Sequence, residues 1–507
     1  MKLPIHQLSL NSRAMRILTA AGAAIATVMT LAGCKVGPNY HQPQTALPGS
    51  FRNEAFAGTN AAPDSVSHWW TTFGDSQLES LIGEATRANL DVRLARARVR
   101  EARALRGVEA SALFPQVDAQ GRYTRVGLSR SSSDGQTAAA VGRSLVGNYF
   151  NAALDMSWEI DVFGGTRRSV EAADADVQAA EESGRDILVS VLAEVGLNYL
   201  ELRGLQKELA VAKDNLRVQQ DTLALTRDRR HAGLASELDT SRSEAQVAST
   251  RSQIPPIEQN LQRAIYRLSV LLGQVPAELE PRLAVVKGIP SAPAAVPVGL
   301  PSDLVRQRPD IRHAEQELAA ATARIGVATA DLFPKFYLTG AAGLQSLEAS
   351  DFFTGGRRFW SLGPSLQWPI FTAGRIRQNI RVHNVRQEAA LIRYEKTVLT
   401  SLEEVENSLV AFGKEQDRYR ALAESEVASR RSVELATERY LGGLVDFLNV
   451  LDAQSSLLSI QDQLVRSESV LSQNAVRLYK ALGGGWQNSP SDFSVASLSR
   501  SGPSVRN

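Results

Sequence analysis

Side chains that could carry out chemistry are few in this chain of 507 residues, and they form no catalytic pattern. The sequence contains neither a G-x-S-x-G nucleophile motif nor a phosphate-binding glycine loop. The only cysteine is Cys34, which cannot form an internal disulfide. We therefore expect no enzymatic activity, no cofactor and no metal site. The six histidines are scattered without the spacing of metal ligands: His6, His41, His68, His231, His313 and His383.

Cys34 follows a segment with the layout of a secretory signal peptide, which we assign to residues 1–33. Three basic residues precede the apolar stretch 17–31, and the segment ends in Leu-Ala-Gly before the cysteine. This ending resembles a bacterial lipobox, in which the thiol is acylated and the cysteine becomes the first residue of the mature chain. A signal peptide that merely ends near a cysteine is the alternative. Lys35, in place of an aspartate that retains many lipoproteins in the inner membrane, favours the outer membrane.

The composition indicates a large protein that is rich in helices. Hydrophobic residues make up 43% and charged residues 22%, which is enough to build a large core. The aromatic content of 6% and the abundance of Ala, Leu, Arg, Glu and Gln favour long helices. A formal net charge of +2 excludes the electrostatic footprint of a nucleic-acid-binding protein. After residue 34 no apolar run reaches the length of about 18 residues that an ordinary transmembrane helix needs.

The chain contains an internal duplication. The residues around Gly443 match those around Gly233 at an offset of 210 positions, and Trp368 matches Trp158 at the same offset. Further upstream the offset becomes 219, and two Leu-Phe-Pro motifs match. Such agreement is typical of a repeated structural unit. We divide the mature chain into an acylated extended leader (34–67), a first repeat (68–273), a connector (274–300), a second repeat (301–485) and a flexible tail (486–507).

Each repeat is organised around a very long helix. No proline occurs between Ser169 and Arg229, and apolar residues recur there every seven positions, as in a coiled-coil seam. A glycine turn and a returning helix follow in each repeat. We expect Pro255-Pro256 to bend or divide the first returning helix, and Ser76 to open a capping box. The expected helices cover residues 75–112, 169–229, 236–272, 375–440 and 447–482.

Each repeat also carries two strand candidates. In the segment 150–160 every second residue is apolar, while Asp155 and Glu159 lie on the other face. Such strands suit a transmembrane barrel, although an ordinary half-buried sheet has the same alternation. Four strands cannot close a barrel, which needs about eight, so oligomerisation would have to supply the rest. The candidates are 117–123, 150–161, 336–344 and 360–370, and the side chains expected to face lipid are Phe150, Leu154, Trp158, Trp360 and Trp368.

Several motifs occur together along the chain: Cys34-Lys-Val-Gly-Pro-Asn-Tyr-His-Gln-Pro43, Trp69-Trp70 before Phe73-Gly-Asp75, the paired Leu-Phe-Pro motifs, Gln253-Ile-Pro-Pro256, and Tyr440 with Leu451-Asp-Ala-Gln454. Together they resemble the TolC/OprM-like outer-membrane efflux family, specifically its NodT-type lipoproteins, over nearly the whole mature chain. The resemblance implies a mostly α fold with a β-barrel portion. In that fold a homotrimer forms one twelve-stranded transmembrane β-barrel, continuous with a long periplasmic α-helical barrel.

The same resemblance implies a periplasmic gate. Leu448 and Asp452 match the family's apolar and acidic constriction positions, and their spacing places both on one face of a helix. A solvated surface charge is the ordinary interpretation of such an aspartate. Some members of the family carry a second aspartate at the position of Asn449 and a locking arginine at the position of Val445. Because this chain has neither, we expect one acidic ring and a weaker lock on the gate. Three further residues belong to this predicted gate. Asp239 and Tyr440 match positions at which the family links adjacent hairpins, and Arg242 is the first-repeat equivalent of Asp452.

The resemblance also implies partners, namely a periplasmic adaptor protein and an inner-membrane pump, commonly of the RND class. The turns expected to dock the adaptor are Gly233-Leu234-Ala235 and Gly443-Leu444-Val445. The resulting hypothesis is an outer-membrane exit duct of a tripartite efflux pump for drugs or other toxic amphiphiles. A tunnel for protein secretion is one alternative. A structural coiled-coil tether of the envelope is another, which would explain Cys34 and the heptads but not the alternating strands in both repeats.

Overall fold

A computed structural model describes residues 35–44, 46–57, 66–141 and 144–487. The predicted signal peptide, Cys34 and all but the first two residues of the predicted tail lie outside these residues. The chain divides into two compact units. Both units contain parts of both repeats, so the repeats are not separate compact domains. Unit 1 comprises residues 1–43, 101–178 and 316–392, and unit 2 comprises residues 44–100, 179–315 and 393–507.

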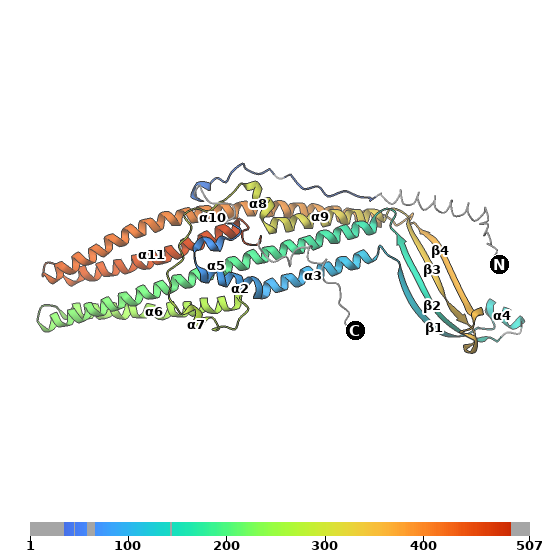
Figure 1. The fold of residues 1–507 in the computed structure, drawn as a ribbon, viewed down its shortest axis with the longest axis horizontal. Coiled ribbons are helices and arrows are strands. Elements are labelled where there is room, and N and C mark those ends of the chain that lie inside the picture. Colours follow the sequence, from blue (N-terminus) through green and yellow to red (C-terminus); the bar gives the residue numbers. More distant parts are fainter. Residues whose placement is uncertain (1–34, 45, 58–65, 142–143, 488–507) are drawn as a thin grey trace, which may run out of the picture. The chain divides into compact units, whose positions relative to one another are not determined.

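The long helices confirm the duplication. Helices α5 (Gly165–His231) and α10 (Arg375–Leu441) each have 67 residues, or about 100 Å at a rise of ~1.5 Å per residue. Their returning helices α6 (Glu237–Leu271) and α11 (Phe447–Ala481) each have 35 residues. Each pair forms a hairpin (Figure 1). Among the described residues, no helix has the length and hydropathy required to cross a membrane.

Two corrections concern the helix predicted at residues 75–112. The predicted helix 75–112 is divided into α2 (Ser76–Ala88) and α3 (Leu90–Ser111), because the Asn89 side chain accepts hydrogen bonds from the Asp91 and Val92 amides and caps α3. The predicted capping box at Ser76 is also wrong. Asp75 is the N-cap of α2, and its carboxylate accepts hydrogen bonds from the amides of the next turn.

Pro255-Pro256 do not divide α6, which is continuous through both residues. A proline inside a helix removes one backbone hydrogen bond and crowds the preceding turn. Here the neighbouring turns are fixed by packing, since Val247 and Ile257 are both buried. Tertiary contacts therefore outweigh the local penalty of the two prolines.

The four predicted strands form one antiparallel sheet in the order β1-β2-β3-β4 (Figure 1). The strands are β1 (Gln116–Gly127), β2 (Val146–Ile160), β3 (Lys335–Ser346) and β4 (Arg358–Gln367). β4 is shorter than predicted and ends before Trp368, which is followed by a proline that has no amide to donate. β1 and β3 repeat the offset of 219, as do α3 and α9 (Pro309–Ala330).

The main hydrophobic core lies in unit 2, where Trp69 is buried and stacks on Tyr479 with ring centroids 6.0 Å apart. The first tryptophan of the Trp69-Trp70 motif therefore packs in the core between the helices rather than at a surface. The remaining short elements are η1 (Glu54–Ala57), η3 (Trp69–Phe73), α4 (Ser133–Ala140), α7 (Glu280–Leu283), α8 (Pro301–Gln307), η4 (Ala349–Asp351) and η5 (Gly355–Arg357).

Candidate functional site

The ends of the two long helices are built alike. At the end of α5 the Leu234 amide donates to the Arg229 carbonyl at 2.7 Å, and the Gly233 amide donates to the Arg230 carbonyl at 2.9 Å. These two bonds define a Schellman motif, which requires a left-handed residue at the glycine position. Gly233 has a φ of 74°. The end of α10 repeats both bonds with Leu444, Arg439, Gly443 and Tyr440.

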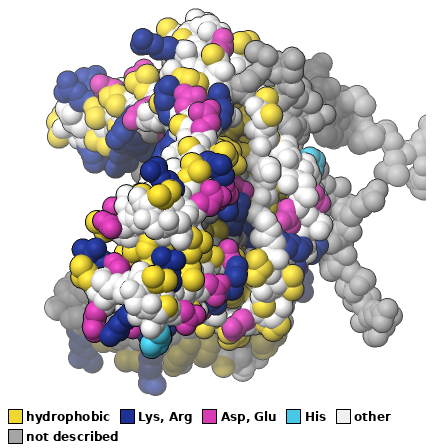
Figure 2. All heavy atoms as spheres, turned by 90° about the vertical axis from the view of Figure 1, so that its left-hand side faces the viewer, with side chains coloured by type: hydrophobic (Ala, Val, Ile, Leu, Met, Phe, Trp, Pro, Cys, Tyr) yellow, Lys and Arg dark blue, Asp and Glu magenta, His cyan; other side chains and the backbone are white. Residues whose placement is uncertain are grey.

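Each turn presents one exposed leucine beside this glycine. Leu234 is 65% exposed and Leu444 is 72% exposed, while Ala235 and Val445 are half-buried. The surrounding surface mixes charges of both signs with apolar side chains (Figure 2). The predicted docking turns are thus accessible, and an apolar side chain marks the centre of each.

Tyr440 belongs to a small buried cluster at the end of the second hairpin. Its ring lies 5.2 Å from that of Phe447, and Val450 completes the cluster. The guanidinium of Arg229, at the end of α5, lies over the Tyr440 ring at 4.8 Å from its centroid. Burial raises the pKa of the Tyr440 hydroxyl. Tyr440 thereby joins the two hairpins through a cation–π contact. Sequence reasoning missed Arg229, and no local signal distinguishes it from other helix arginines.

Asp239 has a role at the start of α6 that the sequence analysis did not anticipate. Its carboxylate accepts from the Ser236 amide at 3.0 Å and from the Ser236 hydroxyl at 2.8 Å, and the Ser236 hydroxyl accepts from the Asp239 amide at 3.2 Å. This is a capping box with aspartate at its third position. Within the protomer Asp239 therefore stabilises the turn itself.

The remaining predicted gate residues are accessible. Leu448 is 44% exposed, Asp452 is exposed, and Arg242 is half-buried on α6. Within the described part of the protomer, neither Asp452 nor Arg242 has an ion-pair partner. The structure therefore brings Tyr440 together with Arg229 and Phe447, but it does not bring Arg242 to Asp452.

Polar contacts connect α11 to α5 beyond this region. The amide of Gln454 donates to the Thr222 hydroxyl at 3.1 Å, and the amide of Asn215 donates to Gln461 at 3.0 Å. The Arg466 guanidinium donates to Glu208 at 3.0 Å, beside a cavity of about 540 Å³ between the hairpins. Burial raises the pKa of the Glu208 carboxyl despite this arginine. These contacts hold the two hairpins together from Gln454 onward along α11.

The sheet in unit 1 has one apolar and one polar face. Antiparallel partners lie on the same face, and the register pairs Leu154 with Ala342, and Ala342 with Trp360. The apolar face carries Phe150, Leu154, Trp158, Leu338, Trp360, Leu362 and Leu366. The opposite face carries Asp118, Gln120, Asp155, Glu159, Thr339 and Lys335. All predicted lipid-facing residues within the strands share the apolar face, and Leu154 and Trp360 are 55% and 81% exposed.

The two tryptophans matched by the duplication make the same hydrogen bond. The Trp158 indole donates to the Leu113 carbonyl at 3.0 Å, and the Trp368 indole donates to the Leu332 carbonyl at 3.0 Å. Both acceptors belong to the Leu-Phe-Pro motifs. The motif thus serves in each repeat to accept the indole N–H where a helix leads into the sheet.

Comparisons with known proteins agree with this geometry. The sequence profile of the family described as outer membrane efflux protein matches residues 81–274 and 300–484. The chain is 34% identical over 478 residues to the toluene efflux pump outer membrane protein TtgF of Pseudomonas putida, covering 92% of this chain and 97% of that protein. It is 31% identical over 458 residues to nodulation protein T of Rhizobium leguminosarum bv. trifolii, covering 90% and 96%.

Solved structures show the same similarity. The outer-membrane channel OprN superposes with a TM-score of 0.84 at 37% sequence identity, covering 90% of this chain and 100% of that one. The similarity thus extends over nearly the full length of both the sequences and the structures.

Proposed function

Because the chain belongs to the outer membrane efflux protein family, we propose that it is the exit duct of a tripartite efflux pump that exports small toxic amphiphiles such as drugs. It is an outer-membrane efflux channel, in agreement with the relatives that are named as outer membrane proteins of efflux pumps. The proposal adds a homotrimeric assembly, surrounding outer-membrane lipid, a periplasmic adaptor and an inner-membrane pump of the RND class or similar. Relatives named for toluene efflux and pyoverdine export support small organic molecules as the exported class.

The observation that carries the proposal is an open sheet with one apolar face. Among the described residues of the protomer, β1 and β4 each have only one neighbouring strand. A long free edge leaves backbone N–H and C=O groups unpaired, and these can form hydrogen bonds with a strand of another chain. If β4 of one protomer pairs with β1 of the next, three protomers of four strands form a closed sheet of twelve. Its apolar face would contact lipid and its polar face would line a water-filled pore.

The helices in unit 1 support the same assembly. In this unit α5 contacts α9, for example through the ion pair between Asp176 and Arg324. Ala172 and Ala175 of α5 are 4% and 7% exposed. Their equivalents in α10, Val382 and Val385, are 44% and 58% exposed. None of residues 101–111 in α3 is buried either, although the equivalent segment of α9 is largely buried. The contact that α5 makes with α9 within one chain is thus available between α10 and α3 of neighbouring protomers.

This arrangement is heterologous, because it joins two different faces of the same chain, and such contacts close into a ring when the rotation between neighbours returns to its start. In that ring Leu448 and Asp452 of three protomers would form the periplasmic gate. Three carboxylates held close together would repel one another, so bound cations or hydrogen-bond donors would have to compensate them. Tyr440 and Arg229 would link the hairpins beside the gate, and Arg242 would be available as a partner across protomers.

The hairpin turns are proposed to dock the adaptor through Leu234 and Leu444. A cysteine at Leu444 should crosslink to the adaptor in cells, whereas a cysteine at the exposed position Ser432, nine residues before the end of α10, should not. Ser236 is a poor position for such a cysteine, because its hydroxyl caps α6. Crosslinks confined to position 432 would argue against docking at the turns.

Reconstitution into planar lipid bilayers tests the proposed duct most directly. A trimeric channel should produce discrete conductance steps, and a coiled-coil tether should produce none.

A mass spectrum of the same sample tests the proposed lipid anchor, since an unmodified Cys34 thiol would exclude it. Deletion of the gene should sensitise cells to several unrelated amphiphiles if small molecules are exported. A secretion tunnel would instead leave a protein trapped in the periplasm.

A further inference from the structure

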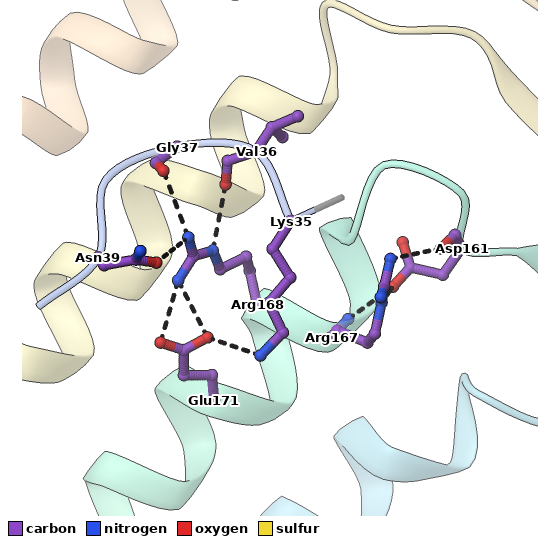
Figure 3. Close-up of polar contacts among 8 residues, drawn as sticks. All are labelled: Lys35, Val36, Gly37, Asn39, Asp161, Arg167, Arg168 and Glu171. Carbon is purple, nitrogen blue, oxygen red and sulfur yellow. Dashed lines mark hydrogen bonds and ion pairs between the residues drawn. The ribbon is translucent and has the colours of Figure 1, made fainter. Parts of the chain in front are cut away.

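The first described residues of the chain are held by a buried arginine in unit 1. Arg168, near the start of α5, has a side chain that is only 1% exposed. Its guanidinium donates to the Val36 carbonyl at 3.1 Å, to the Gly37 carbonyl at 3.3 Å and to the Asn39 side chain at 2.7 Å (Figure 3). Two nitrogen donors of one guanidinium thus bind three oxygen acceptors within residues 36–39. Lysine, with a single charged nitrogen, cannot reproduce this geometry.

A carboxylate and a backbone bond complete the arrangement. Glu171, one turn further along α5, accepts from Arg168 at 3.0 Å and from the Lys35 ammonium at 3.1 Å. The Val36 amide donates to the Phe163 carbonyl at 3.2 Å. Residues 35–39 are therefore bound through both side chains and backbone, as a peptide ligand is bound in a cleft.

Two glycines make this close approach possible. Gly37 has a φ of 86°, and a Cβ on it would lie 2.5 Å from the Cα of Gly326 in α9. A Cβ on Gly326 would in turn lie 2.8 Å from the Arg168 side chain. The equivalent glycine of the first repeat, Gly107, has open space around it. The binding site thus combines Arg168 and Glu171 of the first repeat with Gly326 of the second, and among the described residues of the protomer Gly107 has no such contact.

We propose that Arg168, Glu171 and Gly326 form an internal receptor for residues 35–39, which holds the start of the mature chain at one position on the protein. Lys35 is joined by one peptide bond to Cys34, and consecutive Cα atoms lie about 3.8 Å apart. An acyl chain on Cys34 would then leave the protein at a defined point. This role rests on the proposed lipoprotein, but the binding of residues 35–39 does not depend on acylation.

Limited trypsin digestion of the full-length trimer in detergent tests the receptor. Trypsin cleaves after Lys35 only when residues 35–39 detach from α5, so the cleavage rate reports local opening. Gly37→Ala should speed cleavage at Lys35 by roughly tenfold or more, because the site excludes a Cβ and loses hydrogen bonds to a charged group. This substitution lies in the leader, outside the folded helices. Gly49→Ala is the matched control, since nothing lies within 4 Å of its Cβ position.

A second variant and an internal reference site make the outcome specific. Arg168→Ala should speed cleavage at Lys35 as Gly37→Ala does. The cleavage rate of Arg168→Lys should lie between that of Arg168→Ala and that of the wild type. Cleavage after Arg52, whose amide donates to Glu406 at 2.7 Å, should stay constant in all of these variants. Glu406→Ala should raise cleavage only at Arg52. Unchanged cleavage at Lys35 in both Gly37→Ala and Arg168→Ala would overturn the receptor.

The intact mass before digestion keeps the two hypotheses apart. An acylated Cys34 with protected Lys35 supports both the lipoprotein and the receptor. An unmodified Cys34 would refute the proposed anchor, while protection of Lys35 in the wild type and its loss in the variants would still support the receptor. An acylated protein whose Lys35 is cleaved as fast as an unfolded peptide would refute the receptor and leave the anchor intact.

Discussion

At the scale of single residues, the structure contains buried charges that the predicted function does not use. Arg308 donates to Asp310 at 2.6 Å and to Glu404 at 2.8 Å, beside a cavity of about 200 Å³ that Asp186 also lines. Burial, reinforced by the nearby Asp310 charge, raises the pKa of the Asp186 carboxyl. A raised pKa in the folded state means that folding favours the protonated acid. The stabilising contribution is complete below the unfolded pKa of about 3.9 and is lost as pH rises through the folded pKa.

We therefore expect Asp186→Asn to raise the thermal unfolding midpoint at pH 7 to 8 and to leave it nearly unchanged below about pH 4. Circular dichroism at 222 nm across this pH range provides the measurement. Asp214→Asn serves as the control, because its pair with Arg217 is exposed and contributes little. A lower midpoint for Asp186→Asn at neutral pH would show that attraction to Arg308 and Lys480 outweighs burial.

A second prediction at this scale concerns the apolar face of the sheet. Leu154→Arg should cost about 2–4 kcal/mol if this face contacts the middle of the lipid bilayer. Ser157→Arg is the matched control, since Ser157 lies on the polar face of the same strand. Heat resistance of the assembled trimer on a gel distinguishes them. An equal loss of heat resistance in both variants, or no loss in either, would contradict the assignment of the two faces.

At the scale of elements, the glycine turns determine how each hairpin reverses. Gly443 has a φ of 68°, whereas its neighbour Gly442 has no positive φ. Gly443→Ala should therefore destabilise the turn by about 1 kcal/mol, since an L-residue with a side chain is strained in the left-handed region. Gly442→Ala should have little effect. Hydrogen exchange of the amides around residues 439–450 measures the difference, and equal protection in the two variants would contradict the Schellman assignment.

At the scale of the whole molecule, opening of the proposed gate requires part of α11 to move. The contacts of Gln454, Gln461 and Arg466 with α5 hold α11 beyond the gate. The segment from Phe447 to Asp452 precedes these contacts and is held chiefly by the Tyr440 cluster. An iris-like shift of the second hairpin would therefore begin at its turn, triggered by the adaptor, and would pass solute without any chemical step.

Replacing Leu448 and Asp452 together with alanine should raise single-channel conductance and admit large antibiotics such as vancomycin without a pump. In the proposed trimer this double variant would lose both an apolar and an acidic ring at the gate. Leu238→Ala is the control, because Leu238 is the equivalent of Leu448 in the first hairpin and is similarly exposed, at 56%. Unchanged conductance of a correctly assembled double variant would remove these residues from the gate.

The sequence by itself determined the repeated architecture. Helical and strand periodicities are local properties, and the duplication allowed each repeat to support the interpretation of the other. The long helices, returning helices and strands consequently lie within a few residues of their predicted bounds. The exceptions have local causes that compete with periodicity: Asn89 caps a new helix inside an apparently continuous pattern, and Pro369 follows the early end of β4.

Only the tertiary structure decided which distant side chains meet. Arg229 and Tyr440 are separated by 211 positions (440 − 229), and Arg168 binds a leader segment about 130 positions earlier. Nothing in the local pattern of charges selects these two arginines, because a surface arginine and a buried one look alike in a helix. Their partners are fixed by helix packing and, for Arg168, by the space that two glycines leave. Packing also decided that Asp452 remains exposed, whereas Asp239 caps α6 through a local contact with Ser236, three residues away.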